Sequence, residues 1–397
     1  MIILLISYAY FSAFQCGLQF LGNLAAGNEE SKNIVWKNAF PDLFLSPVTR
    51  SICKIHYHLE QSLFLDYFKT TFKRSCTSNH RNYLNHWDKK AVTYCCMVLF
   101  TCLSAERTAD LVSHTKGVEL AETVVKICRT EPELDWAFLI VTDQFLKCPD
   151  LVAAMYTKLN NQGRITVLDL ISAKLSERRL GSSASSDELN VPERLMQFLA
   201  GCFQEKCMAV LKFTSATDAE DEEALIVIRL LDILCETTSN HEKFSYLQNP
   251  PGLIETVVEL LYQTHLAGKQ SRNVFSVSQS LSFTSHNSHP AVGFKAHLIH
   301  LIGNLCHNNS ENQDKVRELG GIPLILDNCS IDENNPFVSQ WAVFTIRILT
   351  DQNLQNQEVI AQMAHQGVAE SAMLNNMGLQ VEERDGKLYV KSQKHSS

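Results

Sequence analysis

The chain has 397 residues, of which 45% are hydrophobic, and its formal net charge is −8. Binding to a nucleic-acid backbone needs clustered Lys and Arg that displace counterions, so this acidic balance argues against a nucleic-acid partner. A single hydrophobic core stops growing beyond about 250–300 residues, so several packed units or a stack of repeats are expected.

The first stretch, MIILLISYAYFSAF, has the hydrophobicity of a secretory signal. It lacks a basic segment and a small-residue cleavage site, and it is too short to span a bilayer. Phe14, Leu18 and Leu21 continue its helical spacing, with Gln15, Gln19 and Asn23 on the opposite side. The spacing therefore favours a first repeat helix within residues 1–46, and it predicts no membrane insertion.

The helical pattern is interrupted and then resumes. Residues 47–84 are basic and rich in His, Tyr and Phe, and they are interpreted as an insertion. From residue 85, apolar residues again recur at helical spacing, which predicts helices over 120–128, 135–146, 151–159, 165–175 and 195–212 within a central segment 85–267. Residues 180–192, 214–223 and 268–290 are Ser-rich or acidic and are interpreted as loops, since such composition buries little apolar surface.

A repeated pattern appears near the end of the chain. An apolar stretch runs into a polar turn and a second helix at residues 297–326, again at 341–363, and in an earlier copy at 18–45. Asn304 and the equivalent Ile348 are 44 positions apart, inside the ~40–47-residue period of armadillo and HEAT units. Ser310 is predicted to cap a helix that ends before Gly320, and Asn335-Pro336 to begin another.

The final residues change character. Apolar and polar residues alternate on either side of Asp385-Gly386, a tight-turn dipeptide, which predicts a short hairpin. The whole pattern predicts an all-α, armadillo/HEAT-like right-handed α-solenoid with a short extended or hairpin C-terminal cap. Its C-terminal repeats are expected over residues 291–370, and the cap and tail over 371–397.

No catalytic constellation is found in the sequence. Gly-rich phosphate loops, the G-x-S-x-G elbow and the H-E-x-x-H metal motif are all missing. The 13 Cys residues include no CxxC and lie mostly among aliphatic residues, as small core hydrophobes do. His297 and His300 share a helix face, but nothing on that helix completes a ligand set, so a solvated polar face is favoured. The prediction is a non-enzyme with no catalytic residues, metal or cofactor.

The candidate partner surface is a polar row on the helices, opposite their apolar faces. Those faces are Val227, Leu230, Leu231 and Leu234 on one helix and Val343, Ile346 and Leu349 on another. For Asn304 two interpretations stay open: contact with a partner, or bonding to nearby backbone groups. Replacing Asn304 or Arg347 by Ala is expected to change stability by no more than ~0.5 kcal/mol. The predicted row is Gln19, Asn23, Arg229, Asp232, His300, Asn304 and Arg347.

Several stretches together resemble the ataxin-10 family: FKAHLIHLIGNLCHNNSENQDKVRELGGIPLIL, WAVFTIRILTDQNLQNQEVIAQM, GLQVEERDGKLYVKS and, nearer the start, AFQCGLQFLGNLAAGNEESKNIVWKNAFPDLFLS. The resemblance implies a cytoplasmic, non-catalytic protein that acts in neuron survival, neurite outgrowth, cytokinesis and at the ciliary base. It also implies perinuclear and midbody locations and two protein partners, a G-protein β subunit and the O-GlcNAc transferase. A homo-oligomer stays open.

Two departures from the family pattern stand out. The family pattern extends further toward the N-terminus than this chain does. In the family, the segment ending FLS runs almost directly into LNHWDKK, whereas residues 47–83 separate them here. A gene-model error, such as retained intron sequence, and a lineage-specific loop are the two explanations for this insertion.

A second class of function is an armadillo-type nuclear transport adaptor, which binds extended basic peptides through ladders of Trp and Asn. The chain has only four Trp, and Asn recurs clearly in only two repeats, so this ladder is poor. The sequence therefore favours an interaction scaffold over a transport adaptor, and both over an enzyme.

Overall fold

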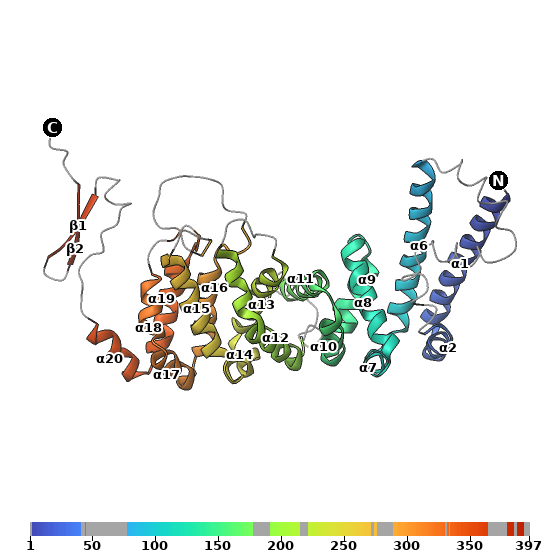
Figure 1. Ribbon diagram of the computed structural model, residues 1–397. Coiled ribbons are helices and arrows are strands. Elements are labelled where there is room, and N and C mark those ends of the chain that lie inside the picture. Colours follow the sequence, from blue (N-terminus) through green and yellow to red (C-terminus); the bar gives the residue numbers. More distant parts are fainter. Residues whose placement is uncertain are drawn as a thin grey trace. The chain divides into compact units, whose positions relative to one another are not determined.

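The computed structural model describes residues 2–40, 44, 78–177, 191–214, 221–270, 274–275, 289–329, 332, 334–363, 379–384 and 387–392. Across these ranges the regular structure is helical, apart from one C-terminal pair of strands. Packed helices follow one another along the chain (Figure 1), as expected for an α-solenoid. The chain forms two compact units, Met1–Leu199 and Ala200–Ser397. Their boundary lies inside the central segment 85–267 and within one helix, α12.

The first unit consists of helices that pack on their neighbours in sequence, with α1 against α2 and α6, and α8 against α7, α9, α10 and α11. One helix, α9, continues directly into a π-helical turn and a 3₁₀ turn, η1 and η2. The elements are α1 (Ile2–Gly27), α2 (Glu29–Ala39), α6 (Ser78–Cys102), α7 (Ala105–Ser113), α8 (Thr115–Thr130), α9 (Asp135–Leu139), η1 (Ile140–Gln144), η2 (Phe145–Lys147), α10 (Pro149–Lys158), α11 (Asn161–Glu177) and the first half of α12 (Glu193–Lys206).

In the second unit, α16 is the central helix. It packs against α13 and α15 on one side and α19 on the other. The elements are η3 (Cys207–Thr214), α13 (Glu222–Thr238), α14 (His241–Phe244), η4 (Ser245–Gln248), α15 (Leu253–Gln270), α16 (Phe294–Cys306), α17 (Ser310–Glu318), α18 (Gly321–Asp327), α19 (Val338–Thr350), α20 (Leu354–Gln362), β1 (Leu379–Arg384) and β2 (Lys387–Ser392).

The polar turns that repeat in the sequence are helix N-caps. Asn28, Asn309 and Asn353 each accept a hydrogen bond from the backbone N–H three residues later, which satisfies a donor that the helix itself leaves unpaired. Asn309 therefore caps α17, and the prediction that Ser310 does so is wrong by one residue. Gly320 has φ +69° between α17 and α18, so α17 ends at a left-handed glycine, and the predicted helix end before Gly320 is confirmed.

Several predicted boundaries differ from the structure. The insertion 47–84 was expected to end before residue 85, but α6 already begins at Ser78; residues 47–77 lie outside the described ranges. The helix expected to start at Asn335-Pro336 begins at Val338, after Phe337 in the left-handed region. Residues 268–290 were interpreted as a loop, yet α15 reaches Gln270, and Val274 and Phe275 within that range are buried.

The last described residues form the predicted hairpin. Strands β1 and β2 pair antiparallel, with Val381 opposite Val390 and Arg384 opposite Lys387. This register leaves residues 385 and 386, outside the described ranges, as the two-residue connection that Asp385-Gly386 predicts. The turn chemistry in the sequence was therefore sufficient to locate the two strands.

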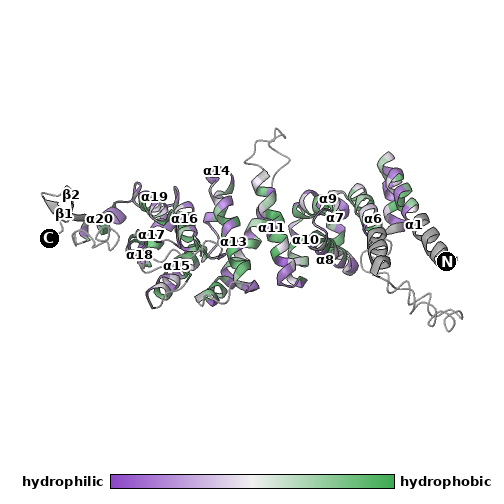
Figure 2. Ribbon diagram, turned by 90° about the horizontal axis from the view of Figure 1, so that it is seen from above, coloured by the Kyte–Doolittle hydropathy of each residue, from purple (hydrophilic) through white to green (hydrophobic). Residues whose placement is uncertain are grey.

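Hydropathy alternates around the helices. Figure 2 shows purple and green residues on different sides of single helices in both units. Among the residues that the structure describes, no helix combines the length and apolar character that crossing a membrane requires.

Candidate functional site

The candidate surface lies in the second unit, where α13, α16 and α19 pack in that order. A row of polar and aromatic side chains follows one side of these three helices, and we call it the flank. Its members are Arg229, Asp232, His297, His300, Trp341 and Phe344, and each is partly exposed. The helices therefore bring together three of the predicted site residues, Arg229, Asp232 and His300.

One pair on the flank joins α13 to α16. His297 Nδ1 lies 2.9 Å from Asp232 Oδ1, and the two side chains are 45% and 34% exposed. Both side chains are partly exposed, although Asp232 Oδ1 itself is shielded from solvent, and such partly exposed pairs contribute little to stability. Asp232 was expected on this surface from the sequence, whereas His297 was considered only as a possible metal ligand.

A second pair joins α16 to α19. The imidazole of His300 stacks on the indole of Trp341, with 3.6 Å between ring centroids and 18° between planes, and Phe344 meets the indole edge-on. Burial in this stack, together with the nearby His297 and His241, lowers the pKa of His300 from 6.5 to about 4. His300 is therefore neutral at physiological pH. Trp341 was missed as a site residue, although its position 44 residues after His297 could have revealed it.

Asn304 does not lie on the surface. Its side chain is 2% exposed, and Nδ2 lies 3.0 Å from Thr238 Oγ1, to which it donates, and 3.2 Å from His300 Nε2. The predicted exposure of Asn304 is wrong because α13 covers the side of α16 that the sequence pattern left polar. The Asn304 amide joins α13 to α16 and, from a buried position, helps to hold the His300 ring in place.

Arg347 is exposed, but it does not lie on the flank. In the 44-residue register it corresponds to Gly303, whereas Ile348 corresponds to Asn304. The apolar face assigned to its helix is correct for Leu349, which is buried, but wrong for Val343. Val343 is 67% exposed, and the buried residues of α19 are Val338, Ala342, Thr345 and Leu349. Arg347 and Val343 therefore share the side of α19 that points away from α16.

Gln19 and Asn23 belong to the first unit. Both are exposed on α1, beside the exposed Phe20 and Leu24, whereas Gln15, predicted on the same polar side, is buried. The structure therefore confirms their exposure but does not join them to the flank, and their role in partner binding stays a prediction.

Buried amides explain why the chain repeats its polar turns. Asn312 Nδ2 donates to Leu305 O and to Gln248 O, each at 2.9 Å. One repeat later, Asn356 Nδ2 donates to Leu349 O at 2.7 Å and to Gln313 O at 3.3 Å. Each Asn thus satisfies a carbonyl at the end of its own repeat's helix and one from the preceding repeat, so the recurring Asn is structural.

These Asn bonds, together with bonds from two Gln side chains, form what we call the amide ladder. Each Gln donates from one repeat to a carbonyl of the next repeat along the chain. Gln248 Nε2 donates to Asn304 O at 3.2 Å, and Gln313 Nε2 donates to Ile348 O at 3.0 Å. Asn304 and Ile348 are equivalent positions, so the same bond recurs one repeat later. These bonds hold the C-terminal ends of α16 and α19 in the same way, and they therefore help to set the positions of the flank residues that the two helices carry.

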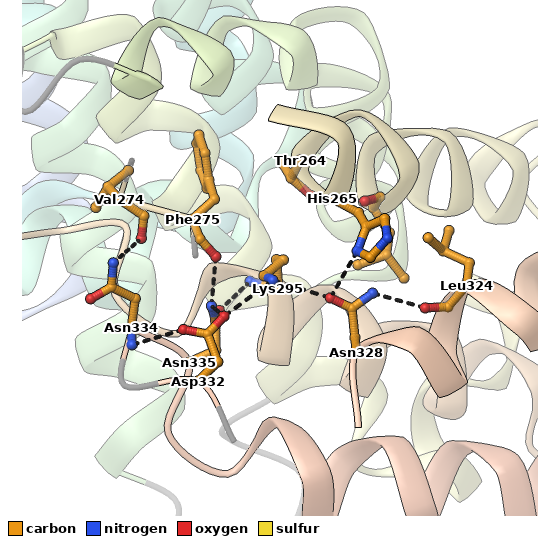
Figure 3. A network of polar contacts seen from close by, with 11 residues as sticks. Thr264, His265, Val274, Phe275, Lys295, Leu324, Asn328, Asp332, Asn334 and Asn335 are labelled. Atoms are coloured by element: carbon orange, nitrogen blue, oxygen red, sulfur yellow. Dashed lines mark hydrogen bonds and ion pairs between the residues drawn. The ribbon is translucent and has the colours of Figure 1, made fainter. Parts of the chain in front are cut away.

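A second polar cluster lies between α15, α16 and α18 (Figure 3). Lys295 is 4% exposed, and its Nζ lies 3.1 Å from Asn328 Oδ1 and 3.2 Å from Asp332 Oδ2. Burial lowers the pKa of Lys295, and the Asp332 carboxylate opposes that change. Asn335 Nδ2 donates to Phe275 O at 2.7 Å, and this bond joins the buried residues Val274 and Phe275 to the cluster. The cluster joins the helices and does not open onto the flank.

The described thiols are largely core residues. Cys95, Cys96, Cys102, Cys207, Cys235 and Cys306 are buried free thiols, as their aliphatic surroundings in the sequence predicted. Burial raises the pKa of Cys96 to about 12, so this thiol stays protonated and unreactive. Within the described ranges, no three or more His, Cys, Asp or Glu side chains are grouped so as to hold a metal ion.

Comparison with known proteins identifies the family. Residues 294–391, from α16 to β2, match the Spinocerebellar ataxia type 10 protein domain. Ataxin-10 of Xenopus tropicalis is 49% identical over 384 residues, which cover 97% of this chain and 71% of the relative. Ataxin-10 of Homo sapiens is 45% identical over 381 residues, covering 96% and 71%. The ataxin-10 homolog of Dictyostelium discoideum is 47% identical over 89 residues, covering 22% and 15%. The chain belongs to the ataxin-10 family.

Proposed function

We propose that this chain is a non-catalytic protein–protein interaction scaffold whose second unit binds a partner through the flank. The observation that carries the proposal is the pairing of half-exposed side chains across three helices, Asp232 with His297 and His300 with Trp341. These groups are held by a buried framework, in which Asn304 and the amide ladder fix the helices. A surface that is already ordered loses little conformational entropy on binding.

The chemistry of the flank suits a protein partner. Trp is enriched at the energetic centres of interfaces, because it contributes a large rigid surface and an N–H donor. Trp341 is already held by His300 and Phe344, so no rotamer ordering is needed when a partner covers it. The neighbouring Asp232 and His297 supply a polar rim.

The proposal extends to the fold. The 44-residue repeat of the amide ladder supports armadillo-type units wound as a right-handed solenoid, with the C-terminal hairpin as an extended cap. In such arrays each repeat contacts only its neighbours, and the surfaces of successive helices form an extended binding face.

The cellular roles rest on family membership. We propose that the chain acts in the cytoplasm, including perinuclear sites, the midbody and the ciliary base, and that it serves neuron survival, neurite outgrowth and cytokinesis. The proposed partners are a G-protein β subunit and the O-GlcNAc transferase. Association of copies with one another is a further proposal of the same kind.

The alternative, a transport adaptor for extended basic peptides, has weaker support. Such an adaptor needs exposed Asn side chains to bind the peptide backbone, but Asn304 is buried and bonded within the chain. One observation favours the adaptor: the Asp232 carboxylate lies on the same flank as the His300–Trp341 stack. That carboxylate already faces His297, which reduces its availability to a lysine or arginine.

Binding measurements on the full chain test the proposal. The variants are Trp341→Leu and His297→Ala on the flank, and the matched control is Tyr262→Ala, an exposed aromatic residue on α15 of the same unit. The probes are the purified G-protein β subunit, the purified O-GlcNAc transferase and a basic peptide. We expect the two flank variants to weaken binding of at least one purified protein by about tenfold or more, as loss of an interface centre does.

The outcomes separate the alternatives. Melting temperatures measured in parallel must stay within a few degrees of the wild type for the comparison to hold. If the control weakens binding while the flank variants do not, the partner surface lies elsewhere and the proposal is wrong. If only the basic peptide binds, and Asp232→Asn abolishes that binding, the adaptor function replaces the scaffold.

A further inference from the structure

Two neighbouring amides between α18 and α19 bond to a segment that lies some 60 residues earlier in the chain. Asn334 Nδ2 donates to Val274 O at 2.9 Å, and Asn335 Nδ2 donates to Phe275 O at 2.7 Å. Figure 3 shows both carbonyls directed toward these two amides. Two successive side chains thus bind two successive backbone carbonyls, and main-chain bonds of this kind are a common way to recognise a peptide.

The residues that bind the segment are held in place by other bonds. We call Asp332, Asn334 and Asn335 the cradle. Asp332 Oδ1 accepts from Asn334 N at 3.0 Å, and Asp332 Oδ2 lies 3.2 Å from Lys295 Nζ. Asn335 Oδ1 accepts from Lys295 N at 3.0 Å, and Asn334 O accepts from Gly293 N at 2.6 Å. These bonds do not involve the segment, so the cradle is preorganised to receive it.

The segment contacts the cradle with an aliphatic and an aromatic residue. Val274 and Phe275 lie in a turn within the Ser-rich range 268–290. Phe275 is fully buried, and its ring lies 5.8 Å from the ring of Phe294 on α16. Val274 is 9% exposed. Another polypeptide with these two residue types in a turn offers the same side chains and the same two carbonyls.

The bonds of the cradle differ from those of the amide ladder. In the ladder, Asn312 and Asn356 satisfy carbonyls at the ends of α16 and α19, which the helices themselves leave unpaired. Val274 and Phe275 belong to no helix or strand. Release of these two residues therefore leaves the helix-end bonds of the ladder intact, and it opens the cradle to a different ligand.

We propose that the cradle is a recognition site for a turn in a partner protein, formed by a β-branched aliphatic residue followed by phenylalanine. The chain's own Val274 and Phe275 occupy this site at rest. The two carbonyls of the partner bond to Asn334 and Asn335, and its phenylalanine packs beside Phe294. A second copy of this chain is not the partner, because its segment fills its own cradle. The cradle is separate from the flank, so the proposal does not depend on the proposed function.

The chain's own segment has an advantage over a free peptide. A ligand joined to its site by a short link acts at an effective concentration on the order of millimolar. The variant Phe275→Ala removes the buried ring and so weakens this competition, while the cradle residues stay unchanged. It should therefore bind a free peptide of the same sequence at least about tenfold more tightly than the wild type does.

Fluorescence anisotropy on the full chain measures this binding, with a labelled peptide of residues 270–280, QSRNVFSVSQS, as the probe. Adding Asn334→Asp to Phe275→Ala should weaken binding about tenfold or more, because aspartate keeps the shape of asparagine but replaces its N–H donor with an acceptor. The matched control adds Asn249→Asp, a change at an exposed asparagine of the same unit, and should bind as Phe275→Ala does. A peptide with alanine in place of its phenylalanine should not bind.

A second measurement uses the wild-type chain, so it holds even where Phe275→Ala fails to fold. The probe is the same peptide with photo-leucine at the position of Val274. At millimolar concentration and under irradiation, it should label the proteolytic fragment that contains Asn334, and mass spectrometry should locate the label. An excess of the unmodified peptide should suppress the labelling, whereas the alanine peptide should not.

The outcomes decide the proposal. Tighter binding by Phe275→Ala that Asn334→Asp removes supports it, and so does specific labelling of the wild-type fragment that contains Asn334. If Phe275→Ala is folded by circular dichroism but binds no peptide, and the wild type is not labelled, the two residues are ordinary core and the proposal is wrong. Binding that Asn334→Asp leaves unchanged, or wild-type dimers that Phe275→Ala dissociates, would also overturn it.

Discussion

The helices α16 and α19 are two versions of the same repeat, and they differ in what surrounds them. Each has 13 residues, but eleven are buried in α16 and four in α19. Lys295 and Asn304 are buried in α16, whereas Val343 is exposed in α19. Burial in this array therefore depends more on whether a helix has neighbours on both sides than on the hydropathy of its residues.

What the two helices share is the amide framework. Gln248 bonds to the carbonyl of Asn304 as Gln313 bonds to that of Ile348, and Asn312 and Asn356 occupy matching positions below them. The two repeats are thus alike at their helix ends, where backbone groups need hydrogen-bond partners. They differ in which helix faces are buried, because their neighbouring helices differ. Substitutions at equivalent positions of the two helices can test this distinction.

The largest contrast is expected at Gly303 and Arg347. Gly303→Val should lower the free energy of unfolding by about 3 kcal/mol, because its side chain would enter the space held by Thr345 and Phe344. Arg347→Val places the same side chain at the equivalent position of α19, where Arg347 is exposed, and should cost about 0.5 kcal/mol or less. Urea unfolding followed by circular dichroism measures both.

The comparison fails if the two variants lose similar stability. A small loss for Gly303→Val would mean that α19 can move away from α16 without cost, so that their close approach is unimportant. A large loss for Arg347→Val would indicate that Arg347 makes contacts that stabilise the fold.

A smaller effect is expected in the amide ladder. Asn312→Ala should cost about 2 kcal/mol, because it leaves the buried carbonyl of Leu305 and the partly buried carbonyl of Gln248 without their donor. Asn356→Ala should cost a similar amount, since its bond to Gln313 O is longer, at 3.3 Å, but the variant also loses the bond that Asn356 Oδ1 accepts from Arg317 Nη1 at 2.9 Å. The same urea titration measures the two variants.

An exposed amide serves as the control for the ladder. Gln355→Ala on α20 removes a solvated side chain of the same chemistry and should leave stability within about 0.5 kcal/mol of the wild type. If Asn312→Ala behaved like Gln355→Ala, water would be replacing the lost bonds, and the ladder would not account for the repeated Asn.

The sequence located most helices because apolar residues recur at helical spacing, and it located the hairpin because Asp385-Gly386 is a specific turn signal. It did not determine exposure within a helix. The periodicity of α16 correctly places Leu298, Leu301 and Leu305 inside, but it cannot show that a second helix covers the polar side. Asn304 was consequently assigned to the surface.

The candidate site was predictable in part for the same reason. Asp232 and His300 were found because they lie opposite clear apolar faces of α13 and α16. Trp341 was missed because an aromatic residue on an amphipathic helix is usually interpreted as core, and only packing against His300 shows it at the edge. Arg347 was misplaced because Val343, the residue used to define its apolar face, is itself exposed.

The smallest expected effect concerns pH and the pair of equivalent positions His300 and Phe344. The pKa of His300 is lowered to about 4 by burial and by His297 and His241, so the unfolded chain binds a proton there that the folded chain does not. Stability should therefore be fully present above pH 6.5 and fall as the pH drops from 6.5 toward 4. His300 is only partly buried, so solvent screening reduces the effect, and the loss should be about 1 kcal/mol.

His300→Phe, which copies the residue of the next repeat, tests the assignment, because phenylalanine keeps the stack on Trp341 without a titrating group. Protonation of His300 would set an N–H against the Asn304 amide, which now donates to Nε2. The variant should therefore show a flatter stability profile between pH 6.5 and 4. The pKa values of His241 and His265 are also lowered by burial, so some slope must remain. If the slope of stability against pH is unchanged in His300→Phe, the pH dependence comes from His241 and His265. A steeper slope would contradict the assignment to His300, because removing its titrating group can only flatten the profile.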